Sequence, residues 1–477
     1  MNESPVQPVP KRRRWPYILA LAIFLFVALF VAYRYWLQRR VEARIEAIRQ
    51  QGYPVSGAEL VAWQKRPPVD PRIVGLAPQA FTSADPWTSE QRRQLPVVGL
   101  APFPSCSQPL SAELTKTIAD YLAADAERMK SLHELSELQP SRYPADWFVP
   151  PFNFPYMNGI RQGQRMLQLE TMCQIESHDS ERAAHSVLAG LRLAKPLGNE
   201  PFVLPHLLRI ACEAICVSSL NYVLCRSPLT DAQIAMLASA IAEAESEQLS
   251  AEAWIGDRCL GMDQYRKLLH DDSWEKMGMW SGFGSDEIDG VVATMDRYLG
   301  PSRSAQVRIW QFKFYKFLGI REWDFLRYLD GMEDGITTSR LSYSLRYQKA
   351  KEWNARAQRV PRRFAFTRGM GSWSGAVFLK EARRIALLRA VRTALAVEQY
   401  RNATGRLPEN LKELVPSHLA SIPVDPFDGK LIRYRKLATG YVVYSVGEDE
   451  ADDGGKEKNA QGRMHETGSD IVFAVER

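Results

Sequence analysis

Residues 15–33 read WPYILALAIFLFVALFVAY, and no side chain from Trp15 to Tyr33 carries a charge. A helix of this length spans roughly 28 Å, which matches the hydrocarbon core of a bilayer. Aromatic residues stand at both ends, where membrane helices place them at headgroup depth: Trp15, Tyr17, Tyr33, Tyr35 and Trp36. The sequence therefore predicts one transmembrane helix over residues 15–36.

Basic residues flank this segment on both sides. Lys11 and Arg12 to Arg14 precede it, and Arg34, Arg39, Arg40 and Arg44 follow it. A short tail with four adjacent cations is hard to translocate, so residues 1–14 are predicted to stay in the cytoplasm. The alternative is a cleaved signal peptide. Such a peptide would have a shorter apolar core and small residues at its cleavage site, whereas Arg34 and two aromatic residues follow Tyr33 here.

The remaining composition is that of globular protein. The chain has 477 residues, of which 45% are hydrophobic and 24% charged, with a net charge of +6. These values favour one membrane segment attached to a soluble body of two or three folded units.

Residues 37–110 are predicted to connect the membrane helix to that body. A charged helix continues over residues 39–51, with Val41, Ile45 and Ile48 on its apolar side, and Gly52 ends it. From Pro67 to Pro109 prolines are frequent and helical periodicity is absent, which predicts an extended connector.

Residues 111–375 are predicted to form a helical body. Ser111 is a candidate N-cap for a first helix, and Thr230 for a later one. The expected helices cover residues 111–138, 159–177, 180–196, 205–225, 230–247, 285–299, 304–318 and 321–347, and a partly irregular stretch covers residues 257–290. Helix pairs joined by short turns favour an α-solenoid-like arrangement, although no fixed-period repeat is visible.

Residues 376–477 are predicted to form a small α+β module. A long helix covers residues 376–402, and a short helix runs from Pro408 to Leu414. Two strands are predicted over residues 432–435 and 441–445, joined by a turn at Thr439–Gly440, and residues 471–476 alternate like a third strand. The three would form a short antiparallel sheet. The fold class is therefore mainly α, with a single membrane helix at one end of the chain and this module at the other.

A run of short motifs in this module resembles a known family. In order they are Tyr400–Arg401, Gly405–Arg406–Leu407–Pro408, Leu411, Leu414–Val415–Pro416, Ile422–Pro423–Val424–Asp425–Pro426, Gly429, Tyr434, Tyr444–Ser445–Val446–Gly447 and Asp470–Ile471. They resemble the globular domain of the major pseudopilins of type II secretion systems, over about a fifth of the chain. The layout of anchor, helical body and tail also resembles uncharacterised membrane proteins of planctomycete-type bacteria. These resemblances imply a bacterial inner membrane, with the bulk of the chain in the periplasm.

The pseudopilin resemblance also implies a calcium ion that pins the loop before the last strand. The matching ligands are Asp449, Asp453 and Asp470, and such a hard cation prefers oxygen ligands. The loop here, residues 448–469, is longer and carries Lys456, Lys458, Arg463 and His465. A solvated acidic loop without a metal is the alternative.

Two departures separate the chain from pilin subunits. Arg14–Trp15–Pro16–Tyr17 stands where pseudopilins have their peptidase site, and no Glu lies within the apolar span. The module is also separated from the membrane helix, whereas in the family one helix is continuous with the other. The chain is therefore not expected to polymerise as a pilin.

No catalytic or metal-binding motif is evident elsewhere. None of the seven histidines lies in a GxSxG or HExxH context, and none of the six cysteines forms a CxxC pair. The cysteines read as small buried hydrophobic residues. In an oxidising compartment, Cys173 could instead bridge to Cys212 or Cys216.

Two surface segments are candidates for binding. Residues 143–156, YPADWFVPPFNFPY, could form either a partner-binding surface or a buried strap. A basic run could bind nucleic acid or anionic lipid, or could pair with the acidic tail; it comprises Arg340, Arg346, Lys349, Lys351, Arg356, Arg359, Arg362, Arg363 and Arg368. A solvated face, or pairing with the acidic tail, is favoured, and nucleic acid is not expected as a partner.

The sequence thus favours a non-enzymatic protein of the bacterial envelope that is anchored in the membrane by residues 15–33. It would mediate protein contacts or assembly, in connection with a secretion or pilus-like system. The alternative is an envelope hydrolase with a site assembled from distant residues of the helical body.

Overall fold

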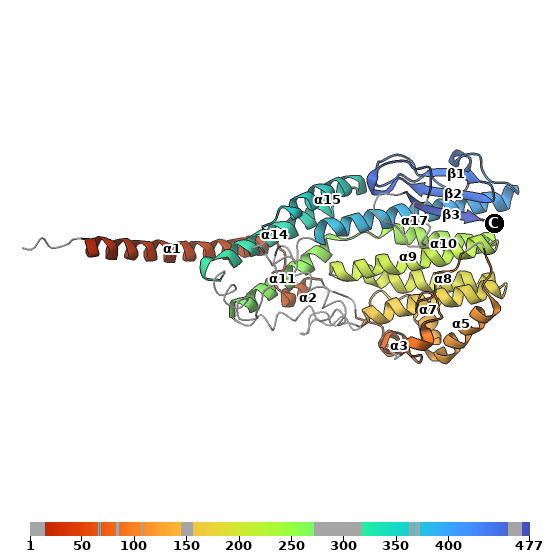
Figure 1. Ribbon diagram of the computed structural model, residues 1–477, viewed down its shortest axis with the longest axis horizontal. Helices are drawn as coiled ribbons and strands as arrows, with labels where there is room; N and C mark the ends of the chain where they lie inside the picture. Colours follow the sequence, from red (N-terminus) through yellow and green to blue (C-terminus); the bar gives the residue numbers. More distant parts are fainter. Residues whose placement is uncertain are drawn as a thin grey trace, which may run out of the picture.

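The computed structural model describes residues 15–64, 66, 68–82, 85–105, 108–144, 156–270, 316–361, 364, 367, 373–456 and 470–477. The described chain is mainly helical, with one small antiparallel sheet. Helix α1 (Trp15–Gln50) projects from one end of an elongated helical body, and the sheet lies at the other end (Figure 1). The predicted cytoplasmic tail, residues 1–14, lies outside the described residues.

Helix α1 is continuous from the apolar segment into the charged one, as predicted. Its side chains are exposed over the apolar part, whereas Leu37, Val41 and Ile48 are buried against the body. The helix ends at Gly52, whose φ of +81° is a left-handed conformation that glycine adopts without steric penalty.

The expected extended connector, residues 67–109, was wrong where the chain forms α3 (Pro71–Thr82) and α4 (Ser89–Arg92). Another short helix, α2 (Gly57–Gln64), precedes it. In α3, Ile73, Ala77, Ala80 and Phe81 are buried on one helical face, which packs on α6 and α7. This burial outweighs the hydrogen bond lost at Pro78, inside the helix.

The central helices confirm the predicted pattern, with one helix divided into two. The first expected helix breaks at Asp125 into α5 (Ala112–Ala124) and α6 (Ala126–Glu137). Helices α7 (Met157–Glu176), α8 (Ser180–Ala194), α9 (Val203–Arg226) and α10 (Asp231–Ser246) follow, with a 3-10 turn η1 (Lys195–Asn199) before α9. Ser111 caps α5 and Thr230 caps α10, because each hydroxyl accepts a backbone N–H of the first turn.

The next helices differ from the prediction in two places. Helix α11 (Ala251–His270) is regular where an irregular stretch was expected. The expected helix over residues 321–347 is two helices, α14 (Ile320–Thr338) and α15 (Tyr343–Gln358). The buried Arg346 donates hydrogen bonds to the carbonyls of Ser339 and Leu341, which stabilises the turn between them. The rest of the expected irregular stretch (residues 271–290), the helix expected over residues 285–299, and residues 304–315 of the one expected over residues 304–318 lie outside the described residues.

The long helix α17 (Trp373–Thr404) carries the sheet. The strands β1 (Arg433–Leu437), β2 (Gly440–Ser445) and β3 (Ile471–Glu476) follow in the order β1-β2-β3, all antiparallel, close to the predicted bounds. Strand β2 is buried along its whole length, and Tyr441 donates a hydrogen bond to the Ala394 carbonyl on α17. Short 3-10 turns, η3 (Leu411–Leu414) and η4 (Gly447–Asp449), flank this region. The predicted short helix thus begins at Leu411, not at Pro408.

Two hydrophobic cores stabilise the body. The larger joins α3, α5 to α10, α17 and the sheet. The smaller joins the second half of α1 to α2, α11, α14 and the start of α17. The sheet also contacts α9 directly, since Asn221 donates to the Ala474 carbonyl at 2.6 Å. The C-terminal region therefore packs as part of the body, and a solenoid-like order of the helices remains a prediction.

Candidate functional site

The first half of α1 exposes its apolar side chains. Phe26 and Leu29 are each 70% exposed, and neighbours along the helix are exposed to a similar degree. By length and composition α1 can cross a membrane. Helix α9 passes the same test, but it is mostly buried inside the body, as expected for a core helix.

The base of α1 is fixed to the start of α14. Arg34 forms a two-pronged ion pair with the carboxylate of Glu322, with N–O distances of 2.9 and 3.1 Å. Glu322 is only 1% exposed, so this pair is shielded from water. Further along both helices, Arg44 of α1 pairs with Asp330 of α14, with an N–O distance of 3.2 Å. The two helices therefore run side by side in the same direction, and α1 cannot pivot freely on the body.

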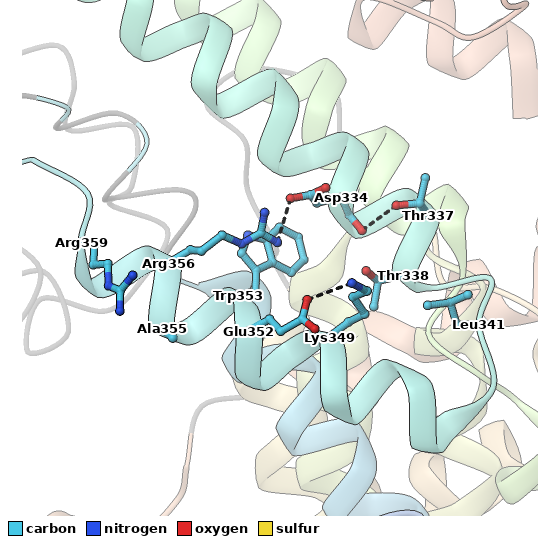
Figure 2. A pocket seen from close by; sticks show the side chains of 10 residues that line it. All are labelled: Asp334, Thr337, Thr338, Leu341, Lys349, Glu352, Trp353, Ala355, Arg356 and Arg359. Atoms are coloured by element: carbon cyan, nitrogen blue, oxygen red, sulfur yellow. Dashed lines mark hydrogen bonds and ion pairs between the residues drawn. The ribbon is translucent and has the colours of Figure 1, made fainter.

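A groove lies between α14 and α15. Its volume is about 680 Å³, and it is lined by Asp334, Thr337, Thr338, Leu341, Lys349, Glu352, Trp353, Ala355, Arg356 and Arg359. Arg356 and Asp334 reach toward each other across it, 3.3 Å apart (Figure 2). Trp353 is 7% exposed; its ring stacks with Phe378 and lies at a tilt to Trp254, both in the smaller core. The groove thus has a rigid aromatic wall and a charged rim.

Three described residues of the basic run, Lys349, Lys351 and Arg356, form ion pairs within the chain. Lys351 contacts Glu450 of the acidic segment at 2.8 Å, and Tyr347 donates to the Glu448 carbonyl. The hydrogen bond with Glu450 raises the pKa of Lys351. The favoured alternative, pairing with the acidic tail, is confirmed for Lys351. Arg362, Arg363 and Arg368 lie outside the described residues.

The three predicted calcium ligands are not gathered into one cluster. Asp470 accepts the backbone N–H groups of Gly455 at 2.7 Å and Asp453 at 3.4 Å, whereas Asp449 accepts that of Ala451. Burial raises the pKa of Asp470. Among the described residues no group of three or more His, Cys, Asp or Glu side chains is placed to hold a metal. Residues 457–469 of the loop lie outside them, so calcium binding stays a prediction.

The calcium prediction is tested by thermal unfolding of the whole chain. A ligand at a hundred times its dissociation constant stabilises the folded state by about 2.7 kcal/mol. The unfolding temperature is expected to rise with millimolar calcium and to fall back with chelator, but not to rise with magnesium. An unchanged unfolding temperature in calcium would contradict the prediction.

Asp425, which was not predicted as a ligand, accepts several hydrogen bonds in the C-terminal region. Asp425 is fully buried and accepts hydrogen bonds from the backbone N–H groups of Phe427 and Val446 and from the Ser445 hydroxyl, at 2.9 to 3.0 Å. Arg433 on β1 pairs with the same carboxylate at 2.8 Å. Asp425 therefore joins the loop before β1 to the end of β2. The sequence showed the motif that contains Asp425, but it did not reveal that this carboxylate connects the two segments.

Ser186, His133 and Glu170 lie together, but their arrangement does not suit a hydrolase. Glu170 accepts hydrogen bonds from the Ser186 hydroxyl at 2.7 Å and contacts His133 Nε2 at 2.9 Å. In a nucleophilic triad the histidine stands between the other two groups, and here the carboxylate does. Ser186 is 1% exposed. This trio joins α6, α7 and α8 and does not form a nucleophile and base.

A buried charged cluster lies between α9, α17 and the end of α10. Arg384 on α17 contacts Glu213 at 3.2 Å and Glu381 at 3.1 Å, and Arg209 contacts Glu247 at 2.7 Å. Glu213, Arg209 and Arg384 are each less than 5% exposed. Sequence reasoning missed this cluster because its members are up to 171 residues apart.

His206 beside this cluster makes stability depend on pH. It is 1% exposed, and burial together with Arg209 and Arg384 lowers its pKa well below the usual value. In the unfolded chain the His206 imidazole takes up a proton near pH 6.5, whereas in the folded chain it stays neutral. The free energy of unfolding is therefore highest above that pH and decreases as pH falls below it. The loss from this group is expected to reach about 1.4 kcal/mol per pH unit.

The measurement is the free energy of unfolding at pH 7.5 and pH 5.5 for the chain and for His206→Gln. The variant should lose less stability on acidification than the unaltered chain. His185→Gln, at an exposed position, is the control and should behave as the unaltered chain does. Equal acid sensitivity in all three would contradict the assignment.

The five described cysteines form no disulfide. Cys212, Cys216, Cys225 and Cys259 are buried and Cys173 is half-buried, as small hydrophobic residues would be. Burial raises the pKa of Cys173 to about 11 and that of Cys259 to about 12, so neither thiol is activated at neutral pH.

The ends of the aromatic segment 143–156 pack on the body. Tyr143 is 1% exposed and donates to the Leu193 carbonyl, and both Tyr143 and Tyr156 contact Phe81. Residues 145–155 lie outside the described residues.

Comparison with protein-family models, with curated proteins and with solved structures found no match to this chain.

Proposed function

We propose that the chain is a non-enzymatic, single-pass protein of the bacterial inner membrane that holds protein partners close to the membrane surface. The N-terminus would be cytoplasmic and the body periplasmic. The observation that carries this proposal is the change of character along α1. Its side chains are apolar and mostly exposed up to Tyr33, whereas Leu37, Val41 and Ile48 of its charged second half are buried against the body.

A continuous helix suits a tether that also orients its cargo. Helix α1 runs from the apolar segment into the smaller core without a break, and Arg34 and Arg44 fix it to α14. A flexible linker would leave the body free to tumble, whereas this connection gives it one orientation relative to the bilayer. A fixed orientation is useful to a protein that presents a surface to partners in the same membrane.

The α14–α15 groove is the surface we assign to such a partner. Lys349 and Arg356 each pair with a carboxylate inside the groove, but Arg359 on its rim is exposed and has no carboxylate within ion-pair distance among the described residues. The rim therefore suits a partner segment that carries an acidic side chain, with an apolar side chain lying against Trp353. Assembly within a secretion or pilus-like system, as the C-terminal resemblance implies, is part of this proposal.

Site-specific photo-crosslinking in living cells tests the groove. A benzophenone amino acid replaces Ala355, an exposed residue of the groove, or Ala235, an exposed residue on α10, in the full chain. A protein adduct is expected from position 355 and not from position 235. Arg359→Glu should reduce the adduct, because it places a negative charge opposite an acidic partner. Equal labelling at the two positions, or no effect of Arg359→Glu, would contradict the proposal.

A further inference from the structure

An aromatic side chain of the body lies beside the exposed apolar part of α1. Phe317, just before α14, is 59% exposed, and its ring centroid is 4.6 Å from that of Phe30 on α1. The two residues are far apart in the sequence. Figure 1 shows α14 beside α1, where α1 leaves the body. A large apolar side chain exposed at this place extends the apolar surface of the predicted membrane segment.

A cluster of three aromatic residues and one cation lies near this pair: Tyr33, Trp36, Trp323 and Arg40. Trp323 donates its indole N–H to the Tyr33 hydroxyl at 3.1 Å, and its ring lies 6.0 Å from that of Trp36. The Arg40 guanidinium lies 5.4 Å from the Trp36 ring centroid and 4.7 Å from that of Trp323. Aromatic rings that combine an apolar body with a polar edge favour the membrane–water interface.

Arg40 differs from the neighbouring arginines in its partners. Arg34 pairs with Glu322, Arg44 with Asp330, and Arg39 lies 3.8 Å from Glu42. Within the described part of the chain, no carboxylate lies within ion-pair distance of Arg40, which is exposed. A guanidinium stacked on aromatic rings is held in place while its N–H groups stay able to bind an anion.

The spacing along α1 places this cation at headgroup depth. Arg40 follows Tyr33 by about 10 Å of helix axis. The headgroup layer on each side of the hydrocarbon core is about 5–8 Å thick, and an arginine side chain can extend back toward it. Phe30 lies within the apolar residues 15–33, so Phe317 beside it lies at the depth of the acyl chains.

We propose that the start of α14 is a second membrane contact, in which Phe317 enters the acyl-chain boundary and Arg40 binds the phosphate of an anionic phospholipid. The proposal rests on the proposed function, since α1 must span a bilayer for lipid to reach these residues. A bilayer is the occupant because this surface is continuous with the exposed apolar part of α1. The body would then sit on the membrane at two points.

Photo-crosslinking to lipid tests the Phe317 contact in the full chain reconstituted in bilayers that contain phosphatidylglycerol. A benzophenone amino acid is placed at Phe317, at Leu29 on the exposed part of α1, and at Leu431, which is 51% exposed in the C-terminal region. Lipid adducts are expected at positions 317 and 29 and not at 431. Adducts at 29 but not at 317 would overturn this inference alone. If no lipid adduct formed at position 29 either, the proposed function would be overturned as well.

The headgroup contact is tested by the phospholipid that copurifies with the chain. Arg40→Gln should retain about fivefold less anionic phospholipid, the effect expected for one cation at an anionic surface. Arg44→Gln is the matched control, because Arg44 already pairs with Asp330. Equal retention by both variants would overturn the assignment to Arg40. Retention that excess inorganic phosphate abolishes would identify a free-anion site instead, and would overturn the lipid assignment.

Discussion

Replacing Arg384 by methionine is expected to lower the free energy of unfolding by about 3–5 kcal/mol, as for other broken buried ion pairs. Arg384 is 4% exposed and contacts the carboxylates of Glu213 and Glu381, which are 3% and 2% exposed. Methionine fills similar volume but leaves both carboxylates in the interior with Arg209 as the remaining nearby cation, 3.7 Å from Glu213. The carboxylates must then be desolvated without adequate compensation, which accounts for the size of the effect.

Denaturant unfolding of the full chain in detergent measures this change. Arg182→Met is the control, because Arg182 is 77% exposed and its ion pair with Asp179 contributes less than about 1 kcal/mol. A loss at Arg384 no larger than that at Arg182 would show that the cluster does not stabilise the contact between α9 and α17.

The second large effect is expected at Asp425. Its replacement by alanine should lower the free energy of unfolding by about 3–5 kcal/mol, because it leaves the Arg433 guanidinium and three hydrogen-bond donors without their shared acceptor. The sheet should be affected first, since Asp425 connects the loop before β1 to the end of β2. Hydrogen exchange of the β2 amides should therefore accelerate more than that of the α7 amides.

Asp452→Ala provides the matched comparison for Asp425. Asp452 is 51% exposed and lies 3.8 Å from the same Arg433, so its loss should change stability by less than about 1 kcal/mol. Similar exchange rates in the Asp425 and Asp452 variants would mean that Asp425 does not have the role inferred from its contacts.

Local signals in the sequence predicted the elements that depend on local chemistry. The uncharged residues 15–33 predicted the start of α1, and the hydroxyl of Thr230 predicted where α10 begins. The turn at Thr439–Gly440 predicted the pair β1 and β2, and alternation predicted β3. Each of these signals is local in the sequence.

Elements that depend on distant contacts were missed. Pro71 and Pro78 predicted an extended chain, but the buried face of α3 against α6 and α7 stabilises a helix there. The turn between α14 and α15 is held by Arg346, whose acceptors could not be known before the chain was folded. The groove depends on that turn, so it could not be predicted either.

The buried charges show the same limit. Arg209 and Glu213 are four residues apart on one helix, and Glu381 and Arg384 are three apart on another, spacings typical of exposed helix faces. Only the packing of α9 against α17 reveals that these pairs face each other in the interior. By contrast, Glu450 does contact Lys351 of the basic run, as their opposite charges predicted.

The central claim is that α1 anchors the chain in a bilayer, and alkaline carbonate extraction of vesicles that contain the full chain tests it most directly. Peripheral proteins are released by this treatment, whereas a helix that spans the bilayer stays in the lipid. The account predicts that the intact chain remains in the membrane pellet. Recovery of the intact chain in the supernatant would contradict it.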